Sequence, residues 1–465
     1  MTCTADKAML LPNPTGSNNE VLHPDGTVRP IYQRMMASLQ QLGIGQLQRR
    51  WREAKDQAAL DAFTFALEPN QFRPVPTDWL PRFIPQEDWE LISAGVAQRQ
   101  RALNKFLADL YCGQQKLIPE EIVYSGHYYN PEVKNFMPPQ GVYAHIYGVD
   151  LVRLEEANYV VLEDNLRIPS GISYQLKCVE LGRRFLPELL EGYELLLYDI
   201  RSTYLDMFAS LSQRECPTSV ILTDGRFGSA FFEHRYLSEL LGIPLVEGSD
   251  LQVGKDNRVC ARTQDGEFEV DVIYRRVEDL ELFVPGLRRA YLQNKVVLVN
   301  ALGTGVVDDK LVFLWVPDMI RHHLDEEPIL KQATSYHLMS AANRRFVLEN
   351  MDRLVLKTRD GYGGQGVFIM PDMGFEERAS LSREIATRQE AFVAQEMLDF
   401  SKHLVFDEEV GEFEERYVDL RVYSVQNGRG EVSVIPGGLT RVALPNTRIT
   451  NNSSGGLCKG TWVVQ

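Results

Sequence analysis

Residues 353–370, RLVLKTRDGYGGQGVFIM, have the spacing of a phosphate-binding segment. Two apolar runs flank a loop, which predicts a strand, a loop and a second strand. Lys357 ends the first run, and the loop carries four glycines: Gly361, Gly363, Gly364 and Gly366. Because glycines let backbone N–H groups approach phosphate oxygens closely, and a lysine adds positive charge, we expect this segment to fold over a triphosphate. A glycine-rich hairpin without a ligand is the alternative.

The same glycines also match G-x-G-x-x-G, a pattern that two other folds use. A dinucleotide-binding fold requires the loop to open a helix, whereas the residues after Gly366 are Val-Phe-Ile-Met and favour a strand. A protein kinase carries its lysine on a later strand, whereas Lys357 precedes the glycines. Neither fold fits this order of residues.

Oxygen ligands gather in residues 148–171, GVDLVRLEEANYVVLEDNLRIPSG. Glu163 and Asn165 lie two apart on a predicted strand, so they share one face of it. A hairpin would bring Asp150 beside them. Two carboxylates and an amide oxygen suit Mg²⁺ that also contacts phosphates. A polar sheet edge with Glu163 in solvent is the alternative.

Two further features fit a nucleotide site. The segment AFVAQEMLDF (391–400) predicts an apolar strand whose end can pair its backbone with an adenine edge, although an ordinary strand end has the same pattern. The end of this strand comprises Gln395, Glu396, Met397 and Leu398. Lys310, in GTGVVDDKLVF, is a candidate second lysine for the phosphates, and a surface lysine is the default interpretation.

Arginines alternate with apolar residues in 417–444. Asp419 and Arg421 share one strand face, and Asn427-Gly428 predicts a hairpin turn. Paired strands would let Arg421 and Arg441 approach each other and stabilise charge on a transferring phosphoryl group or an acyl phosphate. Two arginines on an exposed sheet face are the alternative. Near the end of the chain, Asn452 lies in a polar loop that either touches metal or phosphate or is frayed.

The bulk composition narrows the class of protein. A chain of 465 residues has room for two or three domains. A formal charge of −15 argues against binding nucleic acid or an anionic membrane. No apolar run reaches the ~18 residues that span a bilayer, and residues 1–20 are expected to form a loose tail. Six cysteines without C-x-x-C spacing favour a reduced cytoplasmic protein without structural zinc. The sequence predicts no oligomeric state.

The elements that would position these residues follow from periodicity. The sequence predicts helices over 31–66, 86–117 and about 180–212, and a helical connection over 308–350. Residues 217–248 predict a strand, a glycine-containing loop, a helix and a strand. Further strands are expected over 142–146, 159–162, 270–276 and 295–305.

Together these features resemble the ATP-grasp fold. The resemblance covers the two lysines, the glycine loop, the adenine-binding strand end, the Asp-Leu-Arg strand and a D…E-x-N metal set, from about residue 80 to the end. The metal set ordinarily follows the glycine loop, and here it precedes it by about 200 residues, so the order looks circularly permuted. The stretches VLEDNLRIPSGISY, NALGTGVVDDK and NNSSGG resemble the circularly permuted type 2 ATP-grasp proteins, relatives of glutathionylspermidine synthase.

The resemblance implies a mixed α+β and α/β architecture: a circularly permuted ATP-grasp fold with an α/β pre-ATP-grasp unit and a helical N-terminal region. The expected domains are an N-terminal tail and helical region (1–80), the permuted half of the core with the metal set (81–214), the α/β substrate unit (215–305), and the lid and core with the glycine loop (306–465).

The implied activity is ATP-dependent ligation of a carboxylate to an amine through an acyl phosphate, with ATP and Mg²⁺ as cofactors and small molecules or peptides as substrates. Arg421 and Arg441 are the expected catalytic residues. Arg275 and Arg276 are expected to bind the substrate carboxylate. The expected contacts to the amine partner are Arg226, Ser229 and Glu233. A small-molecule kinase on the same fold and a non-catalytic ATP-binding or scaffold protein are the alternatives.

Overall fold

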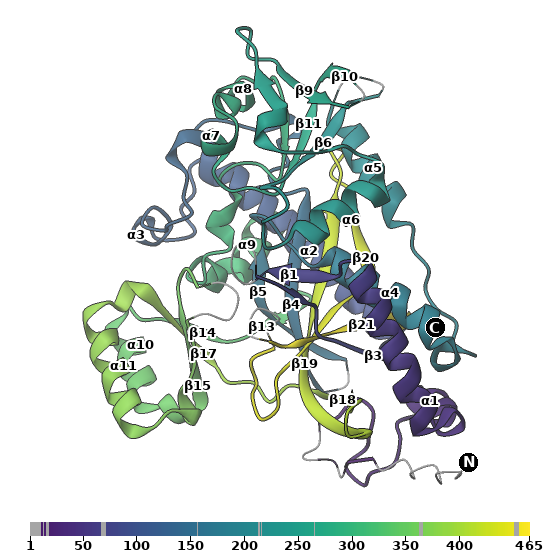
Figure 1. Cartoon of the computed structure of the whole chain (residues 1–465). Helices are drawn as coiled ribbons and strands as arrows, with labels where there is room; N and C mark the ends of the chain where they lie inside the picture. Colours follow the sequence, from purple (N-terminus) through teal and green to yellow (C-terminus); the bar gives the residue numbers. More distant parts are fainter. Residues whose placement is uncertain are drawn as a thin grey trace.

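The computed structural model describes residues 11–12, 14, 18–66, 71–155, 157–212, 214, 216–264, 266–361, 366–450 and 455–465. Its largest sheet has the strand order β13-β5-β4-β19-β20-β21-β3, with β18 paired to β19 (Figure 1). The strands are β3 (Thr77–Pro85), β4 (Ile146–Glu155), β5 (Asn158–Asn165), β13 (Lys331–Gln332), β18 (Lys402–Asp407), β19 (Glu412–Gln426), β20 (Val432–Val442) and β21 (Leu457–Val464). Pairing is antiparallel except for β13 with β5 and β21 with β3.

A smaller antiparallel sheet forms a separate lobe, at the lower left of Figure 1. Its strand order is β14-β17-β15-β16, and the helices α10 (Ala341–Glu349) and α11 (Phe375–Thr387) belong to the same lobe. Leu354 and Leu356 of β15 are buried in a cluster with residues of both helices. Because side chains alternate along a strand, Val355 and Lys357 lie on the opposite face. The strands are β14 (Ser335–His337), β15 (Leu354–Thr358), β16 (Val367–Ile369) and β17 (Phe392–Glu396).

A four-stranded parallel sheet, at the top of Figure 1, has the order β12-β11-β6-β7. Strand β11 is buried throughout, as expected for a parallel strand covered on both faces. The strands are β6 (Ser219–Leu222), β7 (Leu245–Val246), β11 (Val272–Arg275) and β12 (Val297–Val299). The nearby helices are α5 (Ile200–Ser210), α6 (Phe231–Leu241), α7 (Leu280–Phe283) and α8 (Leu287–Leu292), and a three-stranded sheet holds β8 (Leu251–Val253), β9 (Val259–Thr263) and β10 (Gly266–Glu269).

Two of the remaining helices, α2 and α4, pack on the large sheet. Helix α2 contacts β3, β19, β20 and β21, and α4 contacts β21 and β20. Apolar residues of α2 and α4 are buried together with residues of the large sheet, in two hydrophobic clusters. The remaining elements are α1 (Gln33–Leu60), α2 (Gln86–Cys112), α3 (Glu120–Val123), α4 (Ile172–Phe185), α9 (Val316–Leu324), β1 (Thr64–Ala66) and β2 (Phe72–Pro74).

Several predicted elements are confirmed. Helices α1 and α2 lie within the ranges expected from periodicity, and β6, α6 and β7 form the predicted strand–helix–strand unit. The strands expected over 270–276 and 295–305 are β11 and β12. The glycine segment connects the antiparallel strands β15 and β16, as predicted.

The strand expected over 142–146 is wrong, because β4 begins only at Ile146. The backbone N–H groups of Tyr143 and Ala144 donate to the side chain of Asn104, and those of His145 and Ile146 donate to Asn300. Side-chain amides thus replace a neighbouring strand, a substitution that periodicity does not reveal.

Two predicted helical stretches are broken. The stretch near 180–212 contains the end of α4 and, separately, α5, with Pro187 between them. The connection over 308–350 contains α9 and α10, but β13 and β14 lie between them. These strands have two and three residues, which is too short for a period to show.

The end of the predicted loose tail is bound to the fold, which corrects that prediction. Asn19 and Glu20 are buried, and Glu20 lies 2.6 Å from Arg82. Burial alone would raise the pKa of Glu20, but the charge of Arg82 lowers it to about 2. Residues 1–10, the start of the tail, lie outside the described residues.

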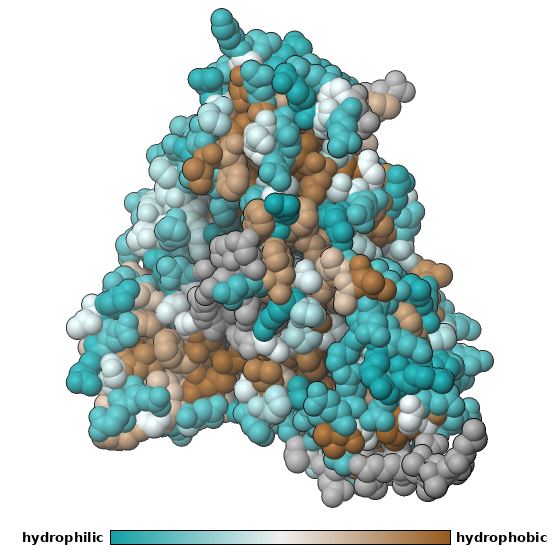
Figure 2. Space-filling view, in the orientation of Figure 1, coloured by the Kyte–Doolittle hydropathy of each residue, from teal (hydrophilic) through white to brown (hydrophobic). Residues whose placement is uncertain are grey.

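Within the described part of the chain, no helix is both long and apolar enough to cross a membrane. Figure 2 shows a face that is largely hydrophilic, with apolar side chains exposed over the small lobe and in the upper centre of the view. The domain boundaries given above remain predictions.

Candidate active site

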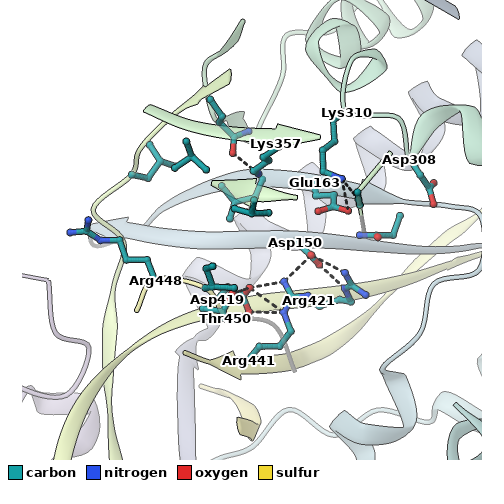
Figure 3. Close-up of a pocket in the computed structure, with 18 of the residues that line it drawn as sticks. Asp150, Glu163, Asp308, Lys310, Lys357, Asp419, Arg421, Arg441, Arg448 and Thr450 are labelled. Carbon is teal, nitrogen blue, oxygen red and sulfur yellow. Dashed lines mark hydrogen bonds and ion pairs between the residues drawn. The ribbon is translucent and has the colours of Figure 1, made fainter. Parts of the chain in front are cut away.

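A cavity of about 350 Å³ lies between the large and small sheets (Figure 3). Strands β4, β5, β19 and β20 line one side, and β15, β16 and β17 line the other. Cationic side chains gather here together with an equal number of carboxylates, a mixture that suits phosphate oxygens and a metal ion at one site. The cationic residues are Arg167, Lys310, Lys357, Arg421, Arg441 and Arg448.

Asp150 is the centre of an ion-pair cluster on the large sheet. Arg421 Nε lies 2.6 Å from Asp150 Oδ1, and Arg441 Nη2 lies 2.8 Å from Asp150 Oδ2. Arg441 also donates to Asp419, its partner across β19 and β20. Burial would raise the pKa of Asp150, but the two arginines hold it well below its usual range. The cluster fixes both guanidinium groups at the cavity wall, where Figure 3 shows them beside Asp150.

The pairing of β4 with β5 sets the positions of Glu163 and Asn165. Asp150 and Glu163 are cross-strand partners, and Gly148 is the partner of Asn165. Glu163 lies 3.9 Å from Lys310, and all three predicted metal ligands line the cavity.

The predicted metal set fits Mg²⁺ in part. The buried amide nitrogen of Asn165 has no hydrogen-bond partner among the described residues, so the amide is able to turn its oxygen toward a cation. Asp150, by contrast, accepts hydrogen bonds from arginines at both oxygens. No group of three His, Cys, Asp or Glu side chains arranged for a metal occurs in the described ranges. Mg²⁺ commonly uses one or two carboxylates with phosphates and water, and Glu163 with Asn165 meets that requirement.

The two predicted lysines approach the cavity from different elements. Lys357, on β15, donates to Gln395 Oε1 at 2.7 Å. Burial lowers the pKa of Lys357 to about 8, against the attraction of Glu163. Lys310 donates to the carbonyl oxygen of Gly361, at the start of the glycine segment. Both ammonium groups therefore lie where phosphate oxygens would contact them.

The glycine segment is partly described. Gly361 lines the cavity. Gly366 has a φ of +72°, and a Cβ atom there would lie 2.1 Å from Thr358 Oγ1, so glycine is required. Gly363 and Gly364 lie outside the described residues, as does Asn452.

The predicted adenine-binding segment forms one end of the cavity, which Gln395, Glu396, Met397 and Leu398 all line. The N–H groups of Glu396 and Met397 already donate to the carbonyls of Thr334 and Arg353, at 2.9 and 3.0 Å. These two donors are therefore not available to a base. The cavity is also lined by apolar side chains, namely Leu162, Val355, Val367, Ile369 and Phe400.

Sequence reasoning missed several polar residues of the cavity wall, among them Asp308, Arg167, Arg448 and Thr450. Asp308 accepts the backbone N–H groups of Leu166 and Arg167, and burial raises its pKa to about 7. Its place two residues before Lys310 was the available signal. Arg167 lies in the stretch VLEDNLRIPSGISY, of which only Glu163 and Asn165 were assigned a role, whereas Arg448 and Thr450 lie outside the stretches that gave a signal.

The predicted substrate residues lie outside this cavity. Arg276 and Glu233 form a fully buried ion pair at 2.9 Å, and Glu233 also accepts the N–H of Gly171. The pair holds a loop inside the fold and does not line the cavity, so its contact with substrate stays a prediction. Arg275 is also buried and donates to backbone carbonyls such as that of Asn300.

Arg226 and Ser229 are exposed on the loop before α6. The Arg226 guanidinium lies over the ring of Phe227, 4.6 Å from its centroid. Neither residue lines the cavity, so their contact with an amine substrate stays a prediction.

The large sheet, the small helical lobe and the cavity between them are the architecture of an ATP-grasp protein. Residues 81–443 match the circularly permuted ATP-grasp type 2 family, and the chain belongs to that family. This finding confirms the fold expected from the sequence.

Comparison with known proteins gives further relatives. An uncharacterized protein of Mycobacterium tuberculosis is 38% identical over 466 residues, covering 96% of this chain and 84% of the relative. A putative glutamate–cysteine ligase of Frankia casuarinae is 35% identical over 97% of this chain, which spans 54% of that protein. A glutathione synthetase-like effector from Globodera pallida has a similar fold, with a TM-score of 0.62 and 14% identity over 90% of this chain and 97% of the effector chain.

Proposed function

We propose that the protein is an ATP-dependent ligase that joins a carboxylate to an amine through an acyl phosphate. The observation that carries this proposal is the shared cavity, which two lysines and two arginines line together with Glu163 and Asn165. Membership of the ATP-grasp family and a relative named as a putative glutamate–cysteine ligase support it.

The residues divide into a base end and a phosphate end. The apolar side chains near Met397 would pack on adenine. Lys357 and Lys310 would bind phosphate oxygens, and the glycine segment, with Gly361 at its start, would close over them. Glu163 and Asn165 would hold Mg²⁺, whose charge would offset that of the phosphate groups.

The reaction proceeds in two steps. An oxygen of the substrate carboxylate attacks the γ-phosphorus, the bond from that phosphorus to the β,γ-bridging oxygen breaks, and ADP leaves. The nitrogen of the neutral amine then attacks the acyl carbon, phosphate leaves with the C–O bonding electrons, and the amine proton passes to solvent. Arg421 and Arg441 would stabilise the charge that builds on the transferred group and on the acyl phosphate. Water exclusion matters because an acyl phosphate hydrolyses.

Two other functions predict different products. A kinase on the same fold would release a phosphorylated small molecule, and a scaffold would bind ATP without turnover. The lysines and arginines that were expected to bind phosphate all line the cavity, which favours catalysis over a scaffold. The five described cysteines form no disulfide with one another, and the expected cytoplasmic location stays a prediction.

The test is ADP release by the purified protein with Mg-ATP, across amino acids, short peptides and polyamines, with mass spectrometry of each active mixture. A product whose mass equals both substrates minus one water is expected. A phosphorylated substrate would instead identify a kinase, and bound ATP without turnover in every mixture would contradict catalysis with these substrates.

A further inference from the structure

A second cavity, of about 380 Å³, adjoins the nucleotide cavity. Arg167 and Glu278 line both cavities, so the two spaces meet at this pair. Arg167 Nε lies 3.0 Å from Glu278 Oε1, and the two side chains are 28% and 54% exposed. The pair is therefore reachable from solvent and stands where a molecule in the second cavity would face the phosphates.

The position of Arg167 is built by its surroundings. Its guanidinium lies over the ring of Tyr128, 4.3 Å from the centroid. A Cβ atom at Gly305 would lie 2.9 Å from Arg167 Cδ, so the glycine leaves room for the side chain. Asp308 accepts the backbone N–H of Arg167, and Arg275 donates to its carbonyl group. These contacts fix the backbone of Arg167 and hold its guanidinium group where the two cavities meet.

The charges of the second cavity favour an anion. Its described lining includes the guanidinium groups of Arg167 and Arg275, against one carboxylate, that of Glu278. Arg275 donates to the carbonyl groups of Asn300 and Val277, which satisfy its hydrogen bonds without neutralising its charge. A ligand carboxylate on Arg167 would balance the excess.

A carboxylate alone would leave Glu278 without its partner. A ligand that also carries an ammonium group would replace both halves of the ion pair, since Arg167 would receive the carboxylate and Glu278 would receive the ammonium. An α-amino acid head group has these two charges side by side.

The second cavity lies at the phosphate end of the first. Asp308, which binds the N–H of Arg167, is drawn near Lys310 and Glu163 and far from Arg448 in Figure 3. The hydroxyl group of Tyr128 lies 3.4 Å from the carbonyl oxygen of Asp360, directly before the glycine segment. A ligand here would therefore lie close to the start of the glycine segment.

We propose that the second cavity binds the head group of a free α-amino acid, with its carboxylate on Arg167 and its ammonium on Glu278. The proposal rests on the ligase function above and names the class of one substrate. The rest of that amino acid would extend past the pair toward the phosphates.

The test is calorimetric titration of free amino acids into the full chain saturated with Mg²⁺ and a non-hydrolysable ATP analogue. The probes are glutamate, aspartate, cysteine, alanine and lysine, each also as its N-acetyl and α-amide derivative. We expect binding of at least one free amino acid, weakened about tenfold or more in either derivative, since each loses one charged contact.

The variants Arg167→Gln and Glu278→Gln should weaken that binding to a similar extent. Glu278 is half exposed, so its variant should fold even if Arg167→Gln does not. Arg50→Gln is the matched control, because Arg50 also pairs with a glutamate, Glu188, at similar exposure but on α1. This control should bind the amino acid as the wild type does.

Three results would overturn the proposal: no amino acid binds although the nucleotide analogue does, a derivative with one charge blocked binds as tightly as the free amino acid, or both variants bind like the wild type. Failure of the ligase function is seen separately, as absent binding of the analogue or absent ADP release in the turnover assay.

Discussion

Asp150 and Arg421 form a bidentate ion pair between the neighbouring strands β4 and β19. Arg421 Nε lies 2.6 Å from Asp150 Oδ1, and Nη2 lies 2.8 Å from Oδ2. The two residues are also backbone partners in the sheet, so the register of the sheet itself brings them together. Because Asp150 is only 3% exposed, the pair is costly to break from one side.

Replacing Asp150 with Asn should therefore impair both stability and turnover. The change leaves Arg421 and Arg441 without their shared carboxylate, and loss of one partner from a buried pair costs about 3–5 kcal/mol. Urea unfolding measures the stability, and ADP release at saturating ATP measures the turnover, which should fall by about two orders of magnitude or more.

The matched control for this variant is Asp206→Asn. Asp206 also receives two hydrogen bonds from one arginine, Arg429, but both side chains are about half exposed. Surface pairs of this kind contribute little to stability. Equal urea midpoints for the two variants would show that burial of Asp150 does not matter.

Glu163→Gln should shift the magnesium requirement rather than the fold. Glu163 is partly exposed and lines the cavity, so the protein should unfold as the wild type does. Loss of the carboxylate should raise the Mg²⁺ concentration for half-maximal ADP release about tenfold or more. Glu163→Ala should abolish turnover. An unchanged magnesium requirement in Glu163→Gln would remove Glu163 from the metal site.

Lys357 should make nucleotide binding sensitive to pH. Its pKa is lowered to about 8 by burial, so the ammonium is charged below pH 8 and loses its proton above it. The Kd for ADP should be constant below pH 8 and rise above it, by up to about tenfold per pH unit. Fluorescence titration from pH 6.5 to 9.5 measures this.

Two variants test whether Lys357 itself causes the pH dependence and is needed for turnover. Lys357→Arg keeps its charge throughout this range, so its Kd should not rise above pH 8. Lys357→Ala should abolish ATP turnover with the fold intact, whereas Lys116→Ala, at an exposed position, should behave as the wild type. Wild-type ADP release by Lys357→Ala would rule out its role.

Asp308 should reduce stability as the pH rises toward neutral. Its folded pKa is raised to about 7 by burial, above the unfolded value, so between pH 4 and 7 the folded state holds more protons than the unfolded state. Stability is therefore fully present below pH 4 and is lost as the pH rises through 7. Asp308→Asn should remove this loss and unfold at a higher urea concentration at pH 8. Its free energy of unfolding at that pH should exceed that of the wild type by on the order of 1–3 kcal/mol. Identical midpoints at pH 8 would contradict the raised pKa.

The cavity residues of two hairpins, those around Lys357 and those around Glu163, could be predicted from the sequence because the signals are local. The glycines, Lys357 and the apolar runs lie within one hairpin, and Asp150 and Glu163 lie on another. A hairpin places residues close in sequence close in space, so spacing alone predicts which side chains meet.

The substrate side could not be read in this way. Arg276, after a strand, and Glu233, in the segment 223–234, were assigned to substrate, but their side chains neutralise each other inside the fold. The second cavity joins Tyr128, Arg167 and Glu278, which come from three distant segments. No periodicity or motif links such loops, because only the tertiary packing brings them together.

Gly366→Ala tests whether the glycine segment needs its close backbone approach. The residue has a φ of +72°, and its new Cβ atom would lie 2.1 Å from Thr358 Oγ1 and 2.9 Å from Thr358 Cβ. The control is Gly430→Ala, at a φ of +87° with nothing within 4 Å, which adds only the backbone cost of about 1–2 kcal/mol. Gly366→Ala should be less stable than this control in urea and should bind ATP more weakly, since β16 must shift away from Thr358. Adding Thr358→Ala should recover part of both losses by removing the clash. If Gly366→Ala and Gly430→Ala unfold together and bind ATP alike, the contact between Gly366 and Thr358 does not shape the loop.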